Sequence, residues 1–131
     1  MSKTIRQSVT LSATPEEVYE VLLDSRKHGK LTGAAARISR EIGGTFSAYD
    51  GYIEGSNVEL VRNKRIVQLW RGSDWPRNHY SRVTFTLRKI AGGTHLSFRQ
   101  SNVPVSQHKS IKQGWIDFYW EPMREMFNGG K

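Results

Sequence analysis

The side chains that most often carry catalysis or bind metals are few in this sequence and widely spaced. His28, His79, His95 and His108 never pair at metal-ligand spacing on one predicted helix or strand. We therefore expect surface histidines and no metal site. The chain has no cysteine, which excludes disulfide bonds, thiolate catalysis and cysteine-ligated metals.

Two groups of residues resemble a hydrolytic site in composition only. Asp50 and Glu54 flank a predicted hairpin, but Asp50 precedes a glycine, and Asp-Gly is a common turn pair. Ser73, Asp74 and His79 are close in sequence, yet nothing there holds a nucleophile against its base. We expect no catalytic residue and no cofactor, and we interpret the protein as a non-enzymatic binding module.

Aromatic side chains favour a different chemistry, the binding of a lipophilic molecule. They form either a closed core or the lining of an internal pocket whose few polar groups are glutamines, which is typical of ligand sites. Trp75, in a loop, either covers the open end of a sheet or caps the core. The predicted ligand pocket consists of Gln7, Trp70, Phe85, Phe98, Gln100, Trp115 and Tyr119.

The charge of the chain favours acidic partners. The formal net charge is +8, with an isoelectric point near 10. Arg62, Lys64 and Arg65 cluster at one predicted turn, which we interpret as a partner surface. Other basic residues alternate along strands, as on a solvated sheet face, so we expect no specific nucleic-acid binding; these are Arg82, Arg88 and Arg99.

Length and hydropathy indicate one domain spanning residues 1–131. No apolar run approaches the roughly 20 residues that cross a membrane, so we expect no membrane insertion. The first residues, MSKTIRQSV, contain no apolar signal segment. We expect a soluble cytoplasmic protein.

The first quarter of the chain predicts a strand and a short helix. Residues 4–12 alternate, with Ile5, Val9 and Leu11 on one face, and Gln7 on that face either meets a buried partner or faces a cavity. In residues 12–25, Thr14 is a suitable N-cap, with a proline at the first helical position. Residues 26–35 form either a loop or a second short helix.

Short antiparallel strands and tight turns are predicted next. The strands are residues 36–40, 45–49, 52–62, 65–71 and 80–89, and a last one in which Leu96 and Phe98 face inward with Gln100 behind them. The turns contain Gly43-Gly44, Asp50-Gly51, Asn63-Lys64 and Gly92-Gly93, of which the Gly-Gly and Asp-Gly pairs supply the positive φ angles that hairpins require.

Residues 106–127 predict one long amphipathic helix. Its apolar stripe comprises Ile111, Trp115, Phe118, Tyr119, Met123, Met126 and Phe127. Ser106 is the predicted N-cap, and Gly129 and Gly130 end the helix. Pro122 causes either a kink near Phe118 or a stop near Trp120, and we expect the kink, with the stripe continuing. The predicted fold is therefore an α+β helix-grip fold, in which a curved antiparallel sheet of about six to seven strands surrounds the C-terminal helix.

Four runs in this order resemble the activator of heat-shock-protein-90 ATPase family, and the resemblance extends from TPEEVY at Thr14 over nearly the whole chain. They are GGTFSAYDGYIEGSNVEL (43–60), RIVQLWRGSDWP (65–76), GTHLSFRQSNVP (93–104) and GWIDFYWEPMREMF (114–127). The resemblance implies a START-like helix-grip fold with a cavity and a heat-shock-protein-90-type chaperone as partner. In the eukaryotic co-chaperones of this family, a separate N-terminal domain makes much of the chaperone contact.

Three functions follow in order of preference. The first is a co-chaperone-like module that meets an acidic chaperone surface through the turn at residues 62–65. The second is a carrier or sensor of a small hydrophobic ligand. The third, an enzyme of the polyketide-cyclase type found elsewhere in the superfamily, needs a titratable group facing the cavity, and the inward positions identified from the sequence are apolar or glutamine.

Overall fold

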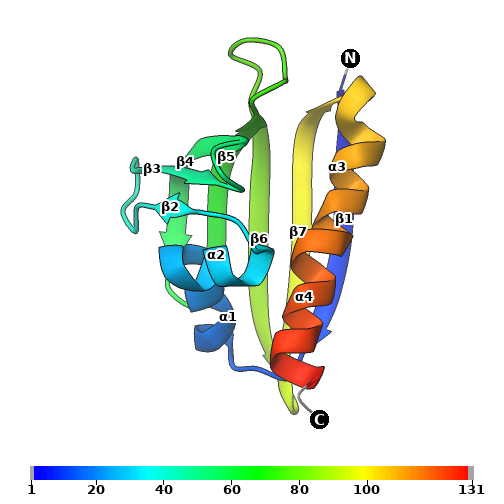
Figure 1. Ribbon diagram of the computed structural model, residues 1–131. Helices are drawn as coiled ribbons and strands as arrows, with labels where there is room; N and C mark the ends of the chain where they lie inside the picture. The colour runs from blue at the N-terminus through cyan, green and yellow to red at the C-terminus, as the bar shows by residue number, and fades with distance from the viewer. Residues whose placement is uncertain (1, 130–131) are drawn as a thin grey trace.

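The computed structural model describes residues 2–129, and its elements follow the predicted order. They are β1 (Ser2–Leu11), α1 (Pro15–Leu23), α2 (Ser25–Thr32), β2 (Arg37–Ile38), β3 (Thr45–Ala48), β4 (Ile53–Val61), β5 (Arg65–Gly72), β6 (Ser81–Ile90), β7 (Gly93–Pro104) and a C-terminal helical segment. The strands form one antiparallel sheet in the order β1-β7-β6-β5-β4-β3-β2. The first strand thus pairs with the last, beside which the C-terminal segment runs (Figure 1).

The C-terminal helix, residues 105–129, is continuous but irregular. A 3-10 turn (Val105–Gln107) leads into α3 (His108–Trp115), a π turn (Ile116–Trp120), α4 (Glu121–Arg124) and a second π turn (Glu125–Gly129). It lies along β1 and β7, while α1 packs against β6 and β7, and α2 lies beside β2 and the C-terminal helix (Figure 1). Fold class α+β and the helix-grip arrangement are confirmed.

The π turn changes which side chains of this helix are buried. Buried positions recur every fourth residue, at Ile111, Trp115, Tyr119 and Met123. The spacing exceeds the 3.6 residues per turn of an α-helix because the π turn contains more residues per turn. Trp120, which the predicted stripe omitted, is buried too. Including Phe118 and Met126 in the stripe was wrong, since they are 39% and 43% exposed.

The start of this helix differs from the prediction, whereas its passage through Pro122 and its extension to Gly129 agree with it. Ser106 is not an N-cap: it lies inside the 3-10 turn, and no side chain caps this turn or α3. The helix continues past Pro122 because the preceding π turn accommodates a residue without an N–H group. Of the two alternatives at Pro122, the stop near Trp120 is therefore excluded, and the helix continues as expected. Gly130 lies outside the described residues.

The two short helices begin as their sequences dictate. The Thr14 side chain accepts a hydrogen bond from the Glu17 backbone N–H, the Glu17 carboxylate accepts one from the Thr14 N–H, and Pro15 opens α1. For residues 26–35, the helical alternative is confirmed: α2 starts after the N-cap Asp24 and ends at Gly33, whose φ is 80°.

The hairpin turns lie where the sequence predicts them. Asp50, Gly51, Asn63 and Gly92 all have positive φ angles. One strand is shorter than predicted: β2 spans Arg37–Ile38 instead of 36–40, because the chain turns away at Ser39. There the Asn57 side-chain amide donates to the Ser39 carbonyl oxygen at 2.7 Å and to that of Glu41 at 3.1 Å.

Buried and exposed residues alternate along the strands, so the sheet has one buried face and one face in contact with solvent. The buried face includes Ile5, Val9, Leu11, Val83, Phe85, Leu87, Leu96, Phe98 and Gln100, as predicted. Arg82, Arg88 and Arg99 are exposed on the other face, also as predicted. Within residues 2–129, no helix is long and apolar enough to cross a membrane.

Candidate functional site

The residues of the predicted ligand pocket gather around one indole. The Trp115 ring lies 4.4 Å from Phe98 and 4.4 Å from Tyr119, measured between ring centroids. Trp70 and Phe85 follow at 5.7 and 5.8 Å. The sheet and the C-terminal helix thus bring these five aromatic side chains into one cluster, which we call the aromatic cluster.

A buried chain of hydrogen bonds crosses this cluster. Trp115 Nε1–H donates to Gln100 Oε1 at 2.8 Å, and Gln100 Nε2 donates to Ser81 Oγ at 2.9 Å. Ser81 Oγ in turn donates to the Trp70 carbonyl oxygen at 2.7 Å. Since both ends of the Gln100 amide have partners inside the protein, burying it carries no penalty for lost hydrogen bonds.

Gln7 ties strand β1 to the C-terminal helix. Its Nε2 donates to the Lys112 carbonyl oxygen at 3.1 Å, and Trp120 Nε1–H donates to its Oε1 at 2.7 Å. Of the two alternatives for Gln7, the structure therefore shows the one in which it meets a partner.

Side chains fill most of the space inside the grip. The cavity that remains beside the aromatic cluster has a volume of about 10 Å³, about the size of one water molecule. The seven predicted residues thus lie together, with Gln7 at the edge, as a packed interior. Their role as a ligand site stays a prediction.

A more open pocket lies beside the cluster, between the C-terminal helix and the β3–β4 turn. Its volume is about 200 Å³. Trp70, Trp115 and Tyr119 reach it from the predicted set. The other lining residues were not predicted: Thr32, Tyr49, Tyr52, Ile53, Ser110, Ile111, Gly114 and Phe118. We call this space the side pocket.

One sequence signal could have indicated the side pocket. Gly114 interrupts a helix whose neighbours favour larger residues, and a glycine there indicates a packing or functional reason. In the structure, a Cβ atom on Gly114 would meet a single neighbour, the Phe118 ring, at 4.0 Å. The glycine thus leaves room that a side chain would occupy.

Two tyrosines, Tyr49 and Tyr52, line the side pocket. The Tyr49 ring lies 5.0 Å from the exposed Phe118 ring, and its backbone has a φ of 53°, an uncommon value for a residue of this size. Tyr52 Oη–H donates to Asp74 Oδ1 at 2.7 Å. Burial, together with this hydrogen bond, raises the pKa of Tyr52 to about 12. The Tyr52 hydroxyl can therefore serve as a neutral polar group.

His28 contradicts the expectation of surface histidines, since it is only 7% exposed. Its Nδ1 lies 3.1 Å from the Leu22 carbonyl oxygen and its Nε2 lies 2.9 Å from Tyr119 Oη. The carbonyl can only accept, so Nδ1 carries the proton and the Tyr119 hydroxyl donates to Nε2. Burial lowers the pKa of His28 and raises that of Tyr119.

No pattern in the sequence indicated this burial, because α2 is mostly polar. The inward positions identified from the sequence therefore missed one titratable residue, since His28 borders the small internal cavity. His79, His95 and His108 are partly exposed.

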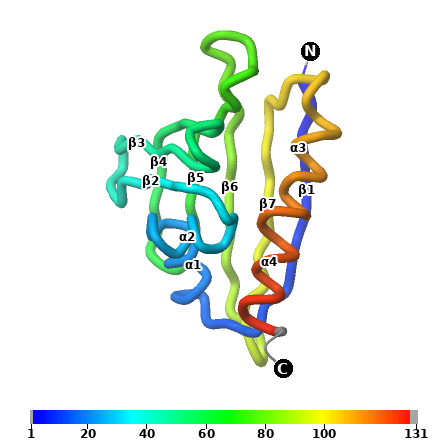
Figure 2. Tube along the Cα trace, in the orientation of Figure 1, coloured from blue at the N-terminus to red at the C-terminus, as the bar shows by residue number. Residues whose placement is uncertain are grey.

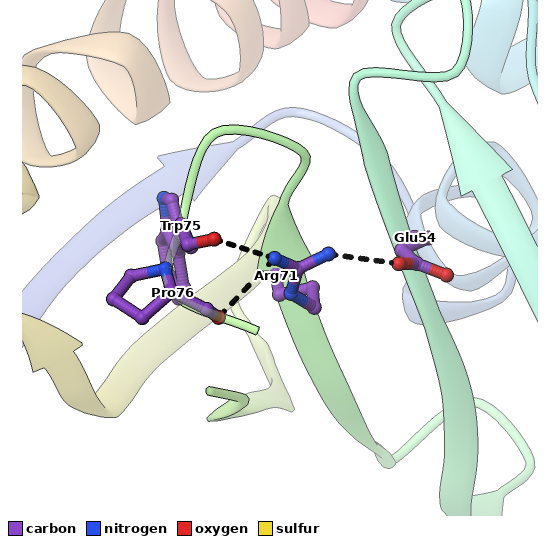
Figure 3. A network of polar contacts seen from close by, with 4 residues as sticks. All are labelled: Glu54, Arg71, Trp75 and Pro76. Carbon is purple, nitrogen blue, oxygen red and sulfur yellow. Dashed lines mark hydrogen bonds and ion pairs between the residues drawn. The ribbon is translucent and has the colours of Figure 1, made fainter. Parts of the chain in front are cut away.

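The loop between β5 and β6 extends beyond the end of the sheet (Figure 2) and is held by Arg71. The guanidinium group pairs with Glu54 at 3.0 Å and donates to the carbonyl oxygens of Trp75 and Pro76 at 2.7 and 3.2 Å (Figure 3). Trp75 is buried and packs on Trp70, with 5.4 Å between ring centroids. The loop tryptophan therefore belongs to the core.

The carboxylates considered for catalysis have structural partners. Asp50 Oδ1 accepts a hydrogen bond from the Ala35 backbone N–H at 2.8 Å, and Glu54 is paired with Arg71. Asp74 holds Tyr52, while His79 Nε2 lies 2.9 Å from the Asn102 carbonyl oxygen. In residues 2–129, no group of three or more His, Cys, Asp or Glu side chains is placed to hold a metal ion.

The predicted partner surface lies at the β4–β5 turn. Arg62, Lys64 and Arg65 are all exposed, and Arg65 lies 3.4 Å from Glu59. The turn is well defined because Asn63 adopts a left-handed φ of 61° and the Lys64 N–H donates to the Val61 carbonyl oxygen at 2.9 Å. Their role in partner binding stays a prediction.

Comparison with known sequences gives a consistent result. A family model described as activator of Hsp90 ATPase homolog 1-like protein matches residues 12–128. The chain is 31% identical over 121 residues to the human activator of 90 kDa heat shock protein ATPase homolog 1, covering 92% of this chain and 36% of that protein. It is 22% identical over 135 residues to an Hsp90 co-chaperone of Saccharomyces cerevisiae, covering 98% and 39%. The chain thus spans little more than a third of the length of these relatives.

Solved structures share the fold. An Hsp90 activator from Plasmodium falciparum superposes with a TM-score of 0.86 at 25% identity, covering 96% of this chain and 94% of that chain. The Aha1 dimer from Colwellia psychrerythraea gives a TM-score of 0.83 at 18% identity, with 98% and 99% covered, and at that identity the likeness concerns the fold alone.

Proposed function

The chain belongs to the family of activator of Hsp90 ATPase homolog 1-like proteins, and from this premise we propose that it is a non-enzymatic, co-chaperone-like module that binds an Hsp90-type chaperone. The observation that carries the proposal is the family match, which covers nearly all of the chain. The human relative is named an activator of the chaperone's ATPase, and the same activity is the one to test here.

The arrangement of charges supports a binding role. The net charge of +8 favours association with acidic surfaces, and the β4–β5 turn presents Arg62, Lys64 and Arg65 to solvent on a rigid hairpin. The closed aromatic cluster also supports a non-enzymatic role, because its polar groups are engaged with one another.

The test is the ATPase rate of the Hsp90-type chaperone from the same organism. We expect the pure protein to change that rate, and the effect to weaken as ionic strength rises towards about 0.15 M, because exposed charges are then screened. An unchanged rate over a wide range of protein concentrations would contradict the proposal.

The side pocket favours a second candidate, a carrier or sensor of a small hydrophobic ligand. Its volume of about 200 Å³ lies below the roughly 300–1,000 Å³ of most drug-sized ligand sites, so a small ligand is expected. The lining combines Ile53, Ile111 and aromatic rings with a few hydroxyl groups, and none of its residues is ionic at neutral pH. This chemistry fits a flat, neutral molecule.

Filling the side pocket tests this candidate. The Gly114→Leu variant is expected to lower the affinity for a neutral naphthol probe by about tenfold or more, because the new side chain occupies the ligand's space. The matched control is Gly114→Ala, which leaves most of the pocket open and should raise helix stability by about 0.5–1 kcal/mol. Equal naphthol affinity for both variants in a fluorescence titration would place the ligand elsewhere.

A further inference from the structure

A second, larger concavity lies at the end of the sheet where β4 turns into β5. It is an open groove of about 770 Å³, to which the start of α1, the β4–β5 turn and the last residues of β6 contribute. Five basic side chains line it, namely Arg62, Lys64, Arg65, Arg88 and Lys89. We call it the basic groove. Arg88 and Lys89 of β6 thus add to the positive charge of the three basic residues at the β4–β5 turn, from which they are distant in sequence.

Most of these cations have no acidic partner. Within residues 2–129, only Arg65 among the five forms an ion pair, with the exposed Glu59 at 3.4 Å. Of the described residues that line the groove, Glu16 alone is acidic. The groove therefore concentrates positive charge that the fold itself does not neutralise, and concave sites focus such a field.

The basic residues of the groove come from two segments, the β4–β5 turn and the end of β6, and a backbone hydrogen bond fixes the distance between them. The Leu87 backbone N–H of β6 donates to the Lys64 carbonyl oxygen of the turn at 2.7 Å. Between the two basic segments, Val61 is only partly buried, so the lining also has apolar surface. A preformed site loses little conformational entropy when a ligand binds.

We propose that the basic groove binds an extended acidic peptide segment of the chaperone partner. Its carboxylates pair with Arg62, Lys64, Arg88 and Lys89, and an apolar side chain between them rests on Val61. The inference rests on the proposed function only in assigning the segment to the chaperone. The groove and its ligand class follow from the charge and shape of this end of the sheet.

The lining favours a peptide over a nucleic acid. Single-stranded nucleic acids are held by aromatic side chains on which bases stack, in addition to cations. Among the residues that the structure describes, none of those lining the basic groove is aromatic. A carboxylate-rich peptide needs only the cations and the apolar floor, both of which are present.

The test uses a fluorescein-labelled peptide of about ten residues in which glutamates alternate with leucines, since extended peptides present alternate side chains to a groove. Binding is measured by fluorescence anisotropy. We expect Arg62→Glu combined with Arg88→Glu to weaken binding by about tenfold or more, because two contacts become repulsive. The matched control, Arg82→Glu with Arg99→Glu, makes the same charge change at two arginines that share the exposed sheet face with Arg88 but do not line the groove. It should weaken binding by about threefold or less.

Further measurements separate the alternatives. Backbone amide shifts in the unmodified protein should change at residues 61–65 and 86–89 when the peptide is added, which requires no variant to fold. Equal weakening by the two double variants would overturn the proposal, as would amide shift changes elsewhere. Displacement of the peptide by a thymidine oligonucleotide that binds more tightly would also overturn it and assign the groove to nucleic acid.

The outcomes also distinguish this inference from the proposed function. Peptide binding in the groove without any change in the chaperone's ATPase rate would support the groove and contradict the co-chaperone role. A normal ATPase effect that survives Arg62→Glu with Arg88→Glu would keep the role and overturn the groove as its contact.

Discussion

Replacing Trp115 with alanine is expected to lower the free energy of unfolding by about 3–5 kcal/mol. The indole is 2% exposed and packs on rings from β5, β6, β7 and its own helix. Its removal creates a cavity and leaves Gln100 Oε1 without its donor. Urea unfolding followed by circular dichroism measures the change, which amounts to a large part of the stability of a typical domain.

Two controls separate packing from hydrogen bonding. Trp115→Phe keeps an aromatic ring but removes the Nε1–H donor, so it should cost less than alanine. Trp120→Phe removes a different indole donor, the one that reaches the partly buried Gln7, and should cost less than Trp115→Phe. Should Trp115→Ala unfold at nearly the same urea concentration as the unmodified protein, the aromatic cluster would not be the centre of the core.

The free energy of unfolding should fall as the pH drops below about 6.5, and protonation of His28 in the unfolded chain should cause a measurable part of that fall. Burial lowers the pKa of His28, an effect only partly offset by its hydrogen bond to the Leu22 carbonyl. In the unfolded chain the imidazole takes up a proton near its ordinary pKa of 6.5, whereas the folded protein excludes that proton until a lower pH. The unfolded state then binds more protons, so acid favours unfolding.

The size of the effect is about 1.4 kcal/mol for each unit by which the pKa is lowered. His28→Gln offers both a donor and an acceptor but does not titrate, so the difference in unfolding free energy between this variant and the parent should change between about pH 8 and pH 5. His95→Gln, at a partly exposed site on β7, is the matched control and should show a smaller change. A pH-independent difference for His28→Gln would contradict the assignment.

Local signals in the sequence were sufficient to predict the helices and strands and their order along the chain. Thr14, Pro15 and Glu17 specify the start of α1 through contacts within one turn of helix. Asp50-Gly51 and Asn63 specify hairpins because they accept positive φ angles. Alternation along β6 and β7 assigned Phe85, Phe98 and Gln100 to the buried face, because a strand presents successive residues to opposite sides.

The C-terminal helix shows where a local rule failed. The stripe was predicted with a period of 3.6 residues, but the π turn before Pro122 widens the spacing to four. Trp120 was thereby brought into the core and Phe118 was left at the rim of the side pocket. A proline indicates that a helix is disturbed, but packing against β1 and β7 decides the form of the disturbance.

Contacts between residues that are far apart in the chain could be known only from the tertiary structure. His28 is buried because α2 packs against the C-terminal helix, where Tyr119, 91 residues later, supplies its hydrogen bond. Arg88 and Lys89 join the turn at residues 62–65 only because β5 pairs with β6. The sequence by itself determined the family, the elements and the sign of the charge, since these depend on neighbouring residues. The closure of the core, the side pocket and the basic groove depend on contacts across the sheet, which only the folded chain decides.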